Sequence, residues 1–214
     1  MNYYVSRTGT IRNLAAMREA AFGILVSRAG EWRTEGFADW IADCGAWADF
    51  MAGREFDDEE FERFLIWIAA QPVAPKFIML PDKVAAGRIS LEMSIRWMNR
   101  VRSMHDLVLI PVQDGMEEDD LAPLVGPSVG IFLGGSTDWK LATMKPWGDF
   151  CRARSIHYHV GRVNTLRRFG MAAGAHAKSA DGSSAAKYAD SVPLLAAGRD
   201  KALKYQIAMS AMVH

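Results

Sequence analysis

The sequence predicts an α/β protein, a compact (β/α)₈ barrel of the TIM type that forms a single domain over residues 1–214. Two observations carry this prediction. Short apolar segments of strand-like composition alternate with segments of helical period, and the alternation repeats about eight times. Half of the residues are hydrophobic and only 23% are charged, so a chain of 214 residues can bury one continuous core. An open parallel sheet would give a similar rhythm and is the alternative fold.

The expected elements follow one another in a regular order along the chain. Strands are expected at residues 3–6, 23–27, 40–43, 76–80, 107–112, 129–133, 156–160 and 175–180. Helices are expected at residues 11–20, 35–39, 57–70, 91–103, 121–124, 140–154, 163–173 and 199–209. The helix at 57–70 opens on four acids, which the helix dipole favours, and continues with Phe61, Phe64, Leu65 and Ile68 on one apolar face. Strand followed by helix, repeated in this way, is typical of the barrel.

Composition and charge exclude several classes of protein. Twenty-five basic residues balance 25 acidic residues, so nucleic-acid binding would depend on a local patch rather than on a global field. Cys44 and Cys151 are too few for a disulfide framework or a cysteine-rich zinc site. The N-terminus carries no signal-peptide pattern, and no apolar run approaches the roughly 20 residues of a membrane span. We therefore expect a cytoplasmic protein without a membrane segment.

Polar residues and glycines follow the strand ends with unusual consistency. In a barrel the carboxyl ends of the strands converge on one face, where the following loops build the active site. Any single acid at such a position is explained by helix N-capping. Several together predict a binding mouth, because polar groups crowded in a pocket are unfavourable unless they meet a ligand or each other. The set comprises Asp43, Asp82, Gln113, Asp114, Gly134, Gly135, Gly161, Arg162 and Asp181.

Six segments surround these strand ends. They are Asp-Cys-Gly-Ala-Trp at 43–47, Leu-Pro-Asp at 80–82, Pro-Val-Gln-Asp-Gly at 111–115, Gly-Ile-Phe-Leu-Gly-Gly at 130–135, His-Val-Gly-Arg-Val-Asn at 159–164 and Ser-Ala-Asp-Gly-Ser at 179–183. In order and spacing they resemble the motifs of the tRNA-guanine transglycosylases, and particularly of the short phage and bacterial relatives that insert 7-deazaguanine bases into DNA. The first segment is similar to the family's Asp-Ser-Gly-Gly-Phe type of motif.

The resemblance implies exchange of guanine for a 7-deazaguanine through a covalent aspartyl-sugar intermediate. The resemblance implies that Asp181 is the nucleophile that attacks C1′ and that Asp43 is the general acid and base. Asp82 and Gln113 are implied to recognise the base. Gly134 and Gly135 are implied to offer backbone N–H groups to its O6, and Gly161 and Arg162 belong to the same substrate-binding set.

Departures from the family pattern bear on the substrate. The tRNA enzymes carry a structural zinc subdomain of three cysteines and a histidine, which this chain cannot build with two cysteines. We therefore expect no metal and no organic cofactor, and DNA rather than tRNA as the polymer, with a free 7-deazaguanine base as the second substrate. A homodimer or an accessory protein is a possible partner. The alternatives are a tRNA-directed enzyme, a hydrolase of the same bond, and a barrel that binds nucleobases or nucleic acid without chemistry.

A polynucleotide substrate requires phosphate contacts, and a group of basic residues lies near the last motifs. The candidates are Arg162, Arg167, Arg168, Lys178 and Lys187. Solvated surface charges are the alternative explanation for all except Arg162, which follows a strand directly.

Aromatic residues and two histidines complete the candidates. Trp47, Trp139 and Tyr158 are possible stacking surfaces, although core packing is the commoner role for such residues. His157 and His159 alternate on one strand and are expected to face the same side. Hydrogen-bonded buried histidines are favoured there over a metal-binding pair.

Overall fold

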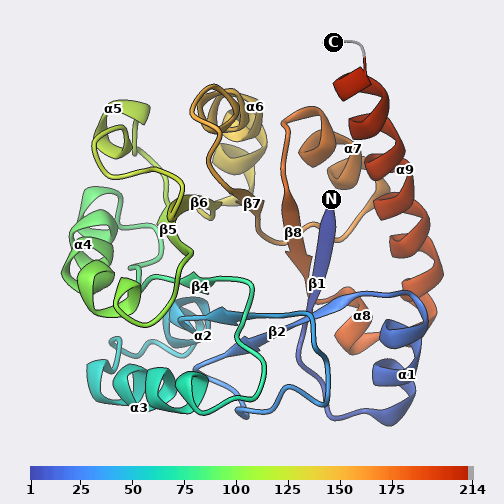
Figure 1. Cartoon of the computed structure of the whole chain (residues 1–214), viewed down its shortest axis with the longest axis horizontal. Helices are drawn as coiled ribbons and strands as arrows, with labels where there is room; N and C mark the ends of the chain where they lie inside the picture. Colours follow the sequence, from blue (N-terminus) through green and yellow to red (C-terminus); the bar gives the residue numbers. More distant parts are fainter. Residues whose placement is uncertain (212–214) are drawn as a thin grey trace.

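The computed structural model describes residues 1–211 and shows a closed parallel barrel with the strand order β1 to β8. Figure 1 shows the strands gathered at the centre of the molecule, with helices around them. The strands are β1 (Asn2–Ser6), β2 (Gly23–Ser27), β3 (Trp40–Asp43), β4 (Ile78–Met79), β5 (Val108–Val112), β6 (Val129–Leu133), β7 (Tyr158–Val160) and β8 (Ser179–Gly182). The barrel closes where β1 pairs with β8 in parallel register, Tyr3 opposite Ala180 and Tyr4 opposite Asp181. The predicted (β/α)₈ barrel is therefore confirmed.

The helices form the outer layer. They are α1 (Ile11–Glu19), α2 (Ala46–Met51), α3 (Asp58–Ala69), α4 (Arg88–Arg102), α5 (Glu118–Leu121), α6 (Thr137–Ala153), α7 (Leu166–Gly174), α8 (Ser184–Lys187) and α9 (Val192–Ala211), with a 3₁₀ turn at Ala189–Ser191. Asp57 caps α3 by accepting a hydrogen bond from the Glu60 amide at 2.8 Å, and the predicted apolar face of this helix is buried. Among residues 1–211, no helix combines the length and the apolar character that crossing a bilayer requires.

Several expected boundaries were wrong. Residues 35–39 form a turn and not a helix, because Glu35 and Gly36 both adopt positive φ angles. The short helices α2 and α8 were not expected, and α5 begins three residues before its expected start. The last helix begins at Val192 instead of residue 199. The eighth strand begins at Ser179, four residues later than expected, which places Asp181 within the strand instead of after it.

The buried residues form two layers. The larger cluster fills the space between the sheet and the helices. The smaller one lies inside the barrel and contains Tyr4, Leu25, Ile41, Phe77, Met79 and Leu109, which come from β1 to β5 or, for Phe77, from the residue before β4. Inside a barrel of this kind, side chains from successive strands stack in layers and fill the centre. β7 and β8 contribute the buried polar side chains His159, Ser179 and Asp181 instead.

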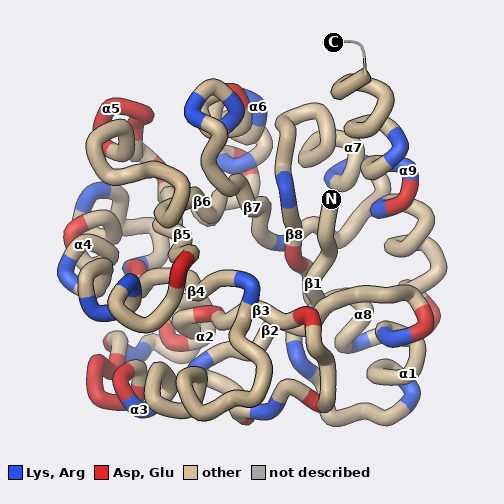
Figure 2. Tube along the Cα trace, viewed as in Figure 1, with Lys and Arg blue, Asp and Glu red and all other residues tan. Residues whose placement is uncertain are grey.

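Charged residues are spread over the helical layer, as the balanced composition predicts. Figure 2 shows acidic residues concentrated on α3 and α5, while lysines and arginines are scattered over many helices. No uniformly basic face is visible in this view. Any contact with a polyanion therefore depends on particular basic residues near a site.

Candidate active site at the barrel mouth

A cavity of about 320 Å³ opens at the carboxyl ends of the barrel strands. Its volume lies at the lower end of the range for small-molecule sites. The residues predicted from the sequence that line it are Asp43, Trp47, Asp82, Gln113, Gly134, Gly135, Arg162, Asp181 and Lys187. Further lining residues include Ser6, Phe132 and Ser183. Residues from the ends of most of the strands therefore meet in one hollow.

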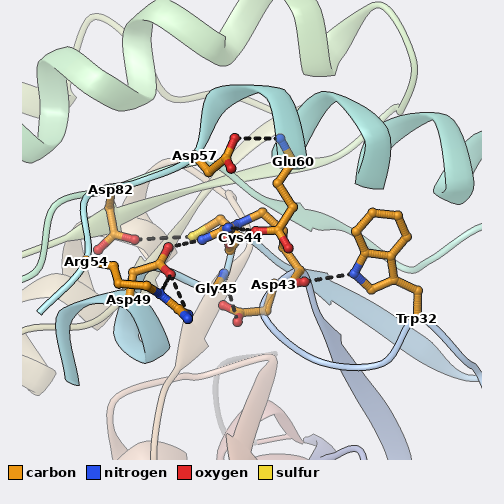
Figure 3. Close-up of polar contacts among 10 residues, drawn as sticks. Trp32, Asp43, Cys44, Gly45, Asp49, Arg54, Asp57, Glu60 and Asp82 are labelled. Atoms are coloured by element: carbon orange, nitrogen blue, oxygen red, sulfur yellow. Dashed lines mark hydrogen bonds and ion pairs between the residues drawn. The ribbon is translucent and has the colours of Figure 1, made fainter. Parts of the chain in front are cut away.

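Asp43 ends β3 at the edge of this cavity. The Gly45 amide donates to Asp43 Oδ2 at 3.1 Å, and the positive φ of Gly45, +82°, turns the chain sharply into α2 (Figure 3). Burial raises the pKa of Asp43, and the negative charge of Asp181 across the cavity contributes to the rise. Both carboxylates that the resemblance pairs line this cavity, and the charge of Asp181 acts on Asp43.

Asp82 and Gln113 form a direct hydrogen-bonded pair on the same wall. Gln113 Nε2 donates to Asp82 Oδ2 at 2.5 Å, and the Cys44 thiol lies 3.3 Å from Asp82 Oδ1. Burial raises the pKa of Asp82 to about 7, and the nearby charge of Asp43 adds to this effect. The Cys44 thiol is itself buried, which together with Asp82 raises its pKa well above the usual range. Cys44 is therefore a neutral neighbour of Asp82 and not a thiolate nucleophile.

Gly134 and Gly135 line the cavity, but their amides are already engaged. The Gly134 amide donates to the Val112 carbonyl at 3.1 Å, and the Gly135 amide donates to Gln113 Oε1 at 3.0 Å. The expectation that these two N–H groups are offered to a base was therefore wrong for this state. What glycine supplies is space: a Cβ at Gly134 would lie 2.9 Å from Gln113 Nε2. The absence of a side chain at Gly134 therefore allows the Gln113 amide to occupy its position beside Asp82.

Asp181 is held from two sides at the end of the barrel interior. His159 Nε2 lies 3.0 Å from Asp181 Oδ1, and the Arg162 amide donates to Asp181 Oδ2 at a longer 3.3 Å. Asp181 is 8% exposed, so its carboxylate is largely enclosed but still reaches the cavity. Gly161 packs beside it, where a Cβ would lie 2.7 Å from the Phe132 ring.

Arg162 lies over the cavity in a constrained conformation. Its φ of +59° is in the left-handed region, which costs a residue other than glycine roughly 1 kcal/mol or more. Its guanidinium donates to the Gly135 carbonyl and stacks 4.7 Å above the Trp47 ring, whose residue is 48% exposed. The Arg168 side chain donates to the Arg162 carbonyl at 3.0 Å and so supports this loop.

A second group of charges lies directly behind Asp43. Arg28 is 1% exposed, donates to the Cys44 carbonyl at 2.7 Å through Nε, and forms ion pairs with Asp49 and Glu60. Arg54 joins Asp49 at 3.0 Å. Figure 3 shows this network beside Asp43 and Asp82. The ion pairs among residues 1–211 include Asp49 but neither Asp43 nor Asp82. This cluster could not be predicted from the sequence, since its members are far apart in the chain.

Three predicted contact residues lie away from the mouth. Lys178 precedes β8, so it is at the opposite end of the barrel, where it lines a separate cavity of about 570 Å³. Arg167 lines a groove between α7 and α9. Tyr158 is buried against α6 and donates its hydroxyl to the Met144 carbonyl at 2.8 Å, so it offers no stacking surface. The sequence did not show that Lys178 lies before its strand, at the opposite end of the barrel, nor that Tyr158 faces outward from β7.

Within residues 1–211, no group of three or more His, Cys, Asp or Glu side chains is arranged to hold a metal ion. The fold and the lining residues together define a (β/α)₈ barrel with a small polar cavity at its mouth, in which three carboxylates converge.

Comparison with known proteins agrees with the fold. No protein-family model matches the chain, and no curated protein matches it. A structure described as native KDPGal is similar with a TM-score of 0.56 and 11% identity over 97% of each chain. A 3-hexulose-6-phosphate synthase from Salmonella typhimurium is similar with a TM-score of 0.55 and 12% identity, over 96% of this chain and 100% of the synthase. A designed cube-shaped protein cage is similar with a TM-score of 0.54 and 10% identity, over 99% of this chain and 75% of that chain. At these identities the likeness shows the barrel fold alone.

Proposed function

We propose that the protein is a transglycosylase that exchanges guanine in nucleic acid, and in DNA first of all, for a 7-deazaguanine base. The observation that carries the proposal is the meeting of Asp43 and Asp181 in one cavity with the Asp82–Gln113 pair. The two acids come from β3 and β8, far apart in the sequence. Base exchange needs two carboxylates with different roles beside a recognition group, and this cavity supplies that combination.

The proposed reaction has two displacements at C1′. In the first, Asp181 Oδ2 bonds to C1′ while the C1′–N9 bond breaks, its electron pair leaves with guanine, and Asp43 donates a proton to the departing base. In the second, Asp43 takes the N9 proton of the incoming 7-deazaguanine, N9 bonds to C1′, and the Asp181 carboxylate is released. A raised pKa suits Asp43 to this role, because a group that both donates and accepts a proton works best near the ambient pH.

Base recognition is assigned to Asp82 and Gln113. Guanine presents two adjacent donors, N1–H and the exocyclic amine, which a carboxylate can accept together. One N–H of the Gln113 amide is used by Asp82, and the second remains to donate to the base carbonyl. Since Gly134 and Gly135 use their own amides internally, Gln113 takes over the donor role that the resemblance gave to these glycines.

The polymer would be held by basic and aromatic groups around the rim. Arg162 and Lys187 line the cavity, and Trp47 lies partly exposed beneath the Arg162 guanidinium. These are the residue types that contact phosphates and stack on bases. Reaching C1′ requires the target nucleotide to leave the stack, which costs a few kcal/mol in a duplex. Single-stranded DNA is therefore expected to react faster than duplex DNA.

A sugar-phosphate substrate, such as the name of the hexulose-phosphate synthase implies for that protein, is less well supported here. Barrels of this type often hold phosphate at the loops after the seventh and eighth strands and at the start of a short extra helix. In this chain the amides of Ser183 and Ser184, at the start of α8, both donate to Asn164 Oδ1, at 3.0 and 3.2 Å. The donors that would bind a phosphate are thus already used.

The test is incorporation of a labelled 7-deazaguanine into single-stranded DNA, duplex DNA and tRNA in parallel. The proposal expects label in DNA with release of free guanine, and more label in the single strand. Label in tRNA alone would replace the DNA assignment by the tRNA-directed alternative. Free guanine and abasic sites without label would indicate a hydrolase. Binding of the base or polymer with neither label nor guanine release would contradict an enzyme and favour the binding barrel.

A further inference from the structure

A chain of hydrogen bonds runs from Asp181 down through the inside of the barrel. His159 Nε2 lies 3.0 Å from Asp181 Oδ1, and His159 Nδ1 lies 2.8 Å from Ser179 Oγ. On the other side of the same hydroxyl, His157 Nε2 lies 2.8 Å from Ser179 Oγ. The four side chains alternate between the neighbouring strands β7 and β8, or the residue just before β7. The expectation that His157 and His159 face the same side is thereby confirmed.

The aromatic lining of the barrel fixes the His159 ring. His159 is 0% exposed, and Phe132 stacks on it with ring centroids 5.4 Å apart and an interplanar angle of 24°. Phe77 approaches edge-on at 5.2 Å, and Tyr4 lies at 6.4 Å. An imidazole held between aromatic rings in this way has little freedom to rotate. Its two nitrogens therefore keep their partners.

The partners determine the direction of the hydrogen bonds. An ionised Asp181 only accepts, so His159 Nε2 carries the proton and donates to it. A neutral His159 then accepts at Nδ1 from the Ser179 hydroxyl, whose oxygen in turn accepts from His157 Nε2. Burial lowers the pKa of His157 to about 3, which keeps this end of the chain neutral. Every donor in the chain thus points toward Asp181.

We propose that His159 is a positioning residue that holds Asp181 Oδ1 through a fixed Nε2–H tautomer and leaves Oδ2 to bond to C1′. This inference rests on the proposed function. In the covalent intermediate Oδ1 becomes the ester carbonyl oxygen and still accepts the hydrogen bond from His159 Nε2. When the incoming base displaces Asp181, the negative charge returns to both oxygens, and the same N–H group stabilises it. Oδ2 is free for the attack because its partner, the Arg162 amide, is the more distant at 3.3 Å.

Two substitutions at His159 separate its donor from its other contacts. The amide nitrogen of glutamine can reach the place of Nε2, whereas that of asparagine reaches the place of Nδ1, beside Ser179. We expect His159→Asn to lower kcat by about 10- to 100-fold, the effect of losing a hydrogen bond to a charged group, with KM changed less than about 2-fold. His159→Gln should recover most of kcat. Equal kcat in His159→Gln, His159→Asn and wild type would overturn the inference.

A matched control comes from the neighbouring residue on the same strand. Tyr158→Phe also removes a buried hydrogen bond, to the Met144 carbonyl, but on the helix side of the sheet. It should lower the melting temperature and leave kcat unchanged. A fall in kcat as large as that of His159→Asn would mean that any loss of packing in β7 slows the reaction, which contradicts the positioning role.

A spectroscopic measurement decides the tautomer without relying on any variant. In the wild-type protein with ¹⁵N-labelled histidine, the His159 ring is expected as the neutral Nε2–H form with an unprotonated Nδ1. The Nδ1–H form would overturn the inference even in a fully active enzyme. The two failures are distinguishable: absence of exchange and of adduct in wild type, with any polymer, counts against the proposed function, whereas an active wild type with the wrong tautomer counts against His159 alone.

Discussion

Two groups of buried acids lie near the carboxyl end of β3, and they differ in whether arginine side chains form ion pairs with them. Asp49 is buried against Arg28 and is also paired with Arg54. Asp43 and Asp82, which are drawn with Asp49 in Figure 3, form no ion pair among residues 1–211, and burial raises their pKa values. Burying an acid without a counter-ion destabilises the fold, and the proposed function gives these unpaired acids a role in chemistry and binding that would explain their retention.

The paired group also positions the unpaired one. Arg28 donates to the carbonyl of Cys44, the residue that follows Asp43, and its guanidinium packs 4.6 Å from the Phe56 ring. The turn that carries Asp43 is therefore anchored to α2 and α3 by the ion pairs of Arg28. On the proposed function, one set of carboxylates stabilises the fold and the neighbouring set acts on the substrate, so the same Asp-to-Asn exchange should affect the two sets differently.

The largest effect is expected for Asp181→Asn. The amide is a far weaker nucleophile than a carboxylate, so exchange activity should fall by roughly 10³-fold or more. The melting temperature should change little, because His159 Nε2 can still donate to the side-chain oxygen. Incorporation of labelled base and thermal unfolding of the same preparation provide the two measurements. A variant that keeps wild-type activity would remove Asp181 from the reaction.

The matched change in the paired group is Asp49→Asn. The substitution removes the negative charge that pairs with the buried Arg28 guanidinium. Breaking a buried ion pair lowers the free energy of unfolding by about 3–5 kcal/mol. Activity per folded molecule should stay within about 2-fold of wild type, since Asp49 does not line the cavity. Chemical denaturation gives the free energy. If Asp49→Asn loses activity but not stability, the distinction between the two groups is mistaken.

Asp82 should make stability depend on pH. Its pKa of about 7 in the folded protein is above its ordinary value of 3.8, so between these values the native state holds a proton that the unfolded state has released. The free energy of unfolding should therefore fall as pH rises from about 4 to 7. Asp82→Asn removes this contribution, so its stability relative to wild type should rise by on the order of 4 kcal/mol across that window. Parallel curves for the two proteins would contradict the raised pKa.

The smallest effect is expected at the rim. Lys187→Ala should weaken binding of single-stranded DNA by a few-fold and lower the salt dependence by about one phosphate contact. Lys178→Ala is the matched control, because Lys178 lies at the other end of the barrel. Fluorescence anisotropy at several salt concentrations measures both. Equal weakening by the two substitutions would place the polymer elsewhere than over the mouth.

The sequence predicted the barrel because the hydrophobic period of each segment is a local property that the chain itself displays. It also predicted that polar residues at the strand ends meet in one cavity, since residues that end parallel strands must meet at one end of a barrel. It could not predict which donors remain free: the Gly134 and Gly135 amides are taken by Val112 and Gln113. The helix expected at 35–39 failed for a similar reason, because positive φ angles at Glu35 and Gly36 depend on tertiary contacts such as the ion pair of Glu35 with Arg7.

The measurement that bears most directly on two acids acting at one sugar is peptide mapping of a trapped protein–DNA adduct by mass spectrometry. The wild-type protein, incubated with guanine-containing single-stranded DNA and denatured before exchange is complete, should yield one modified peptide, with the sugar on Asp181. In Asp43→Asn the same adduct should form more slowly, and the incoming base should resolve it more slowly. An adduct on Asp43, on Cys44 or on any residue outside the cavity would contradict the account.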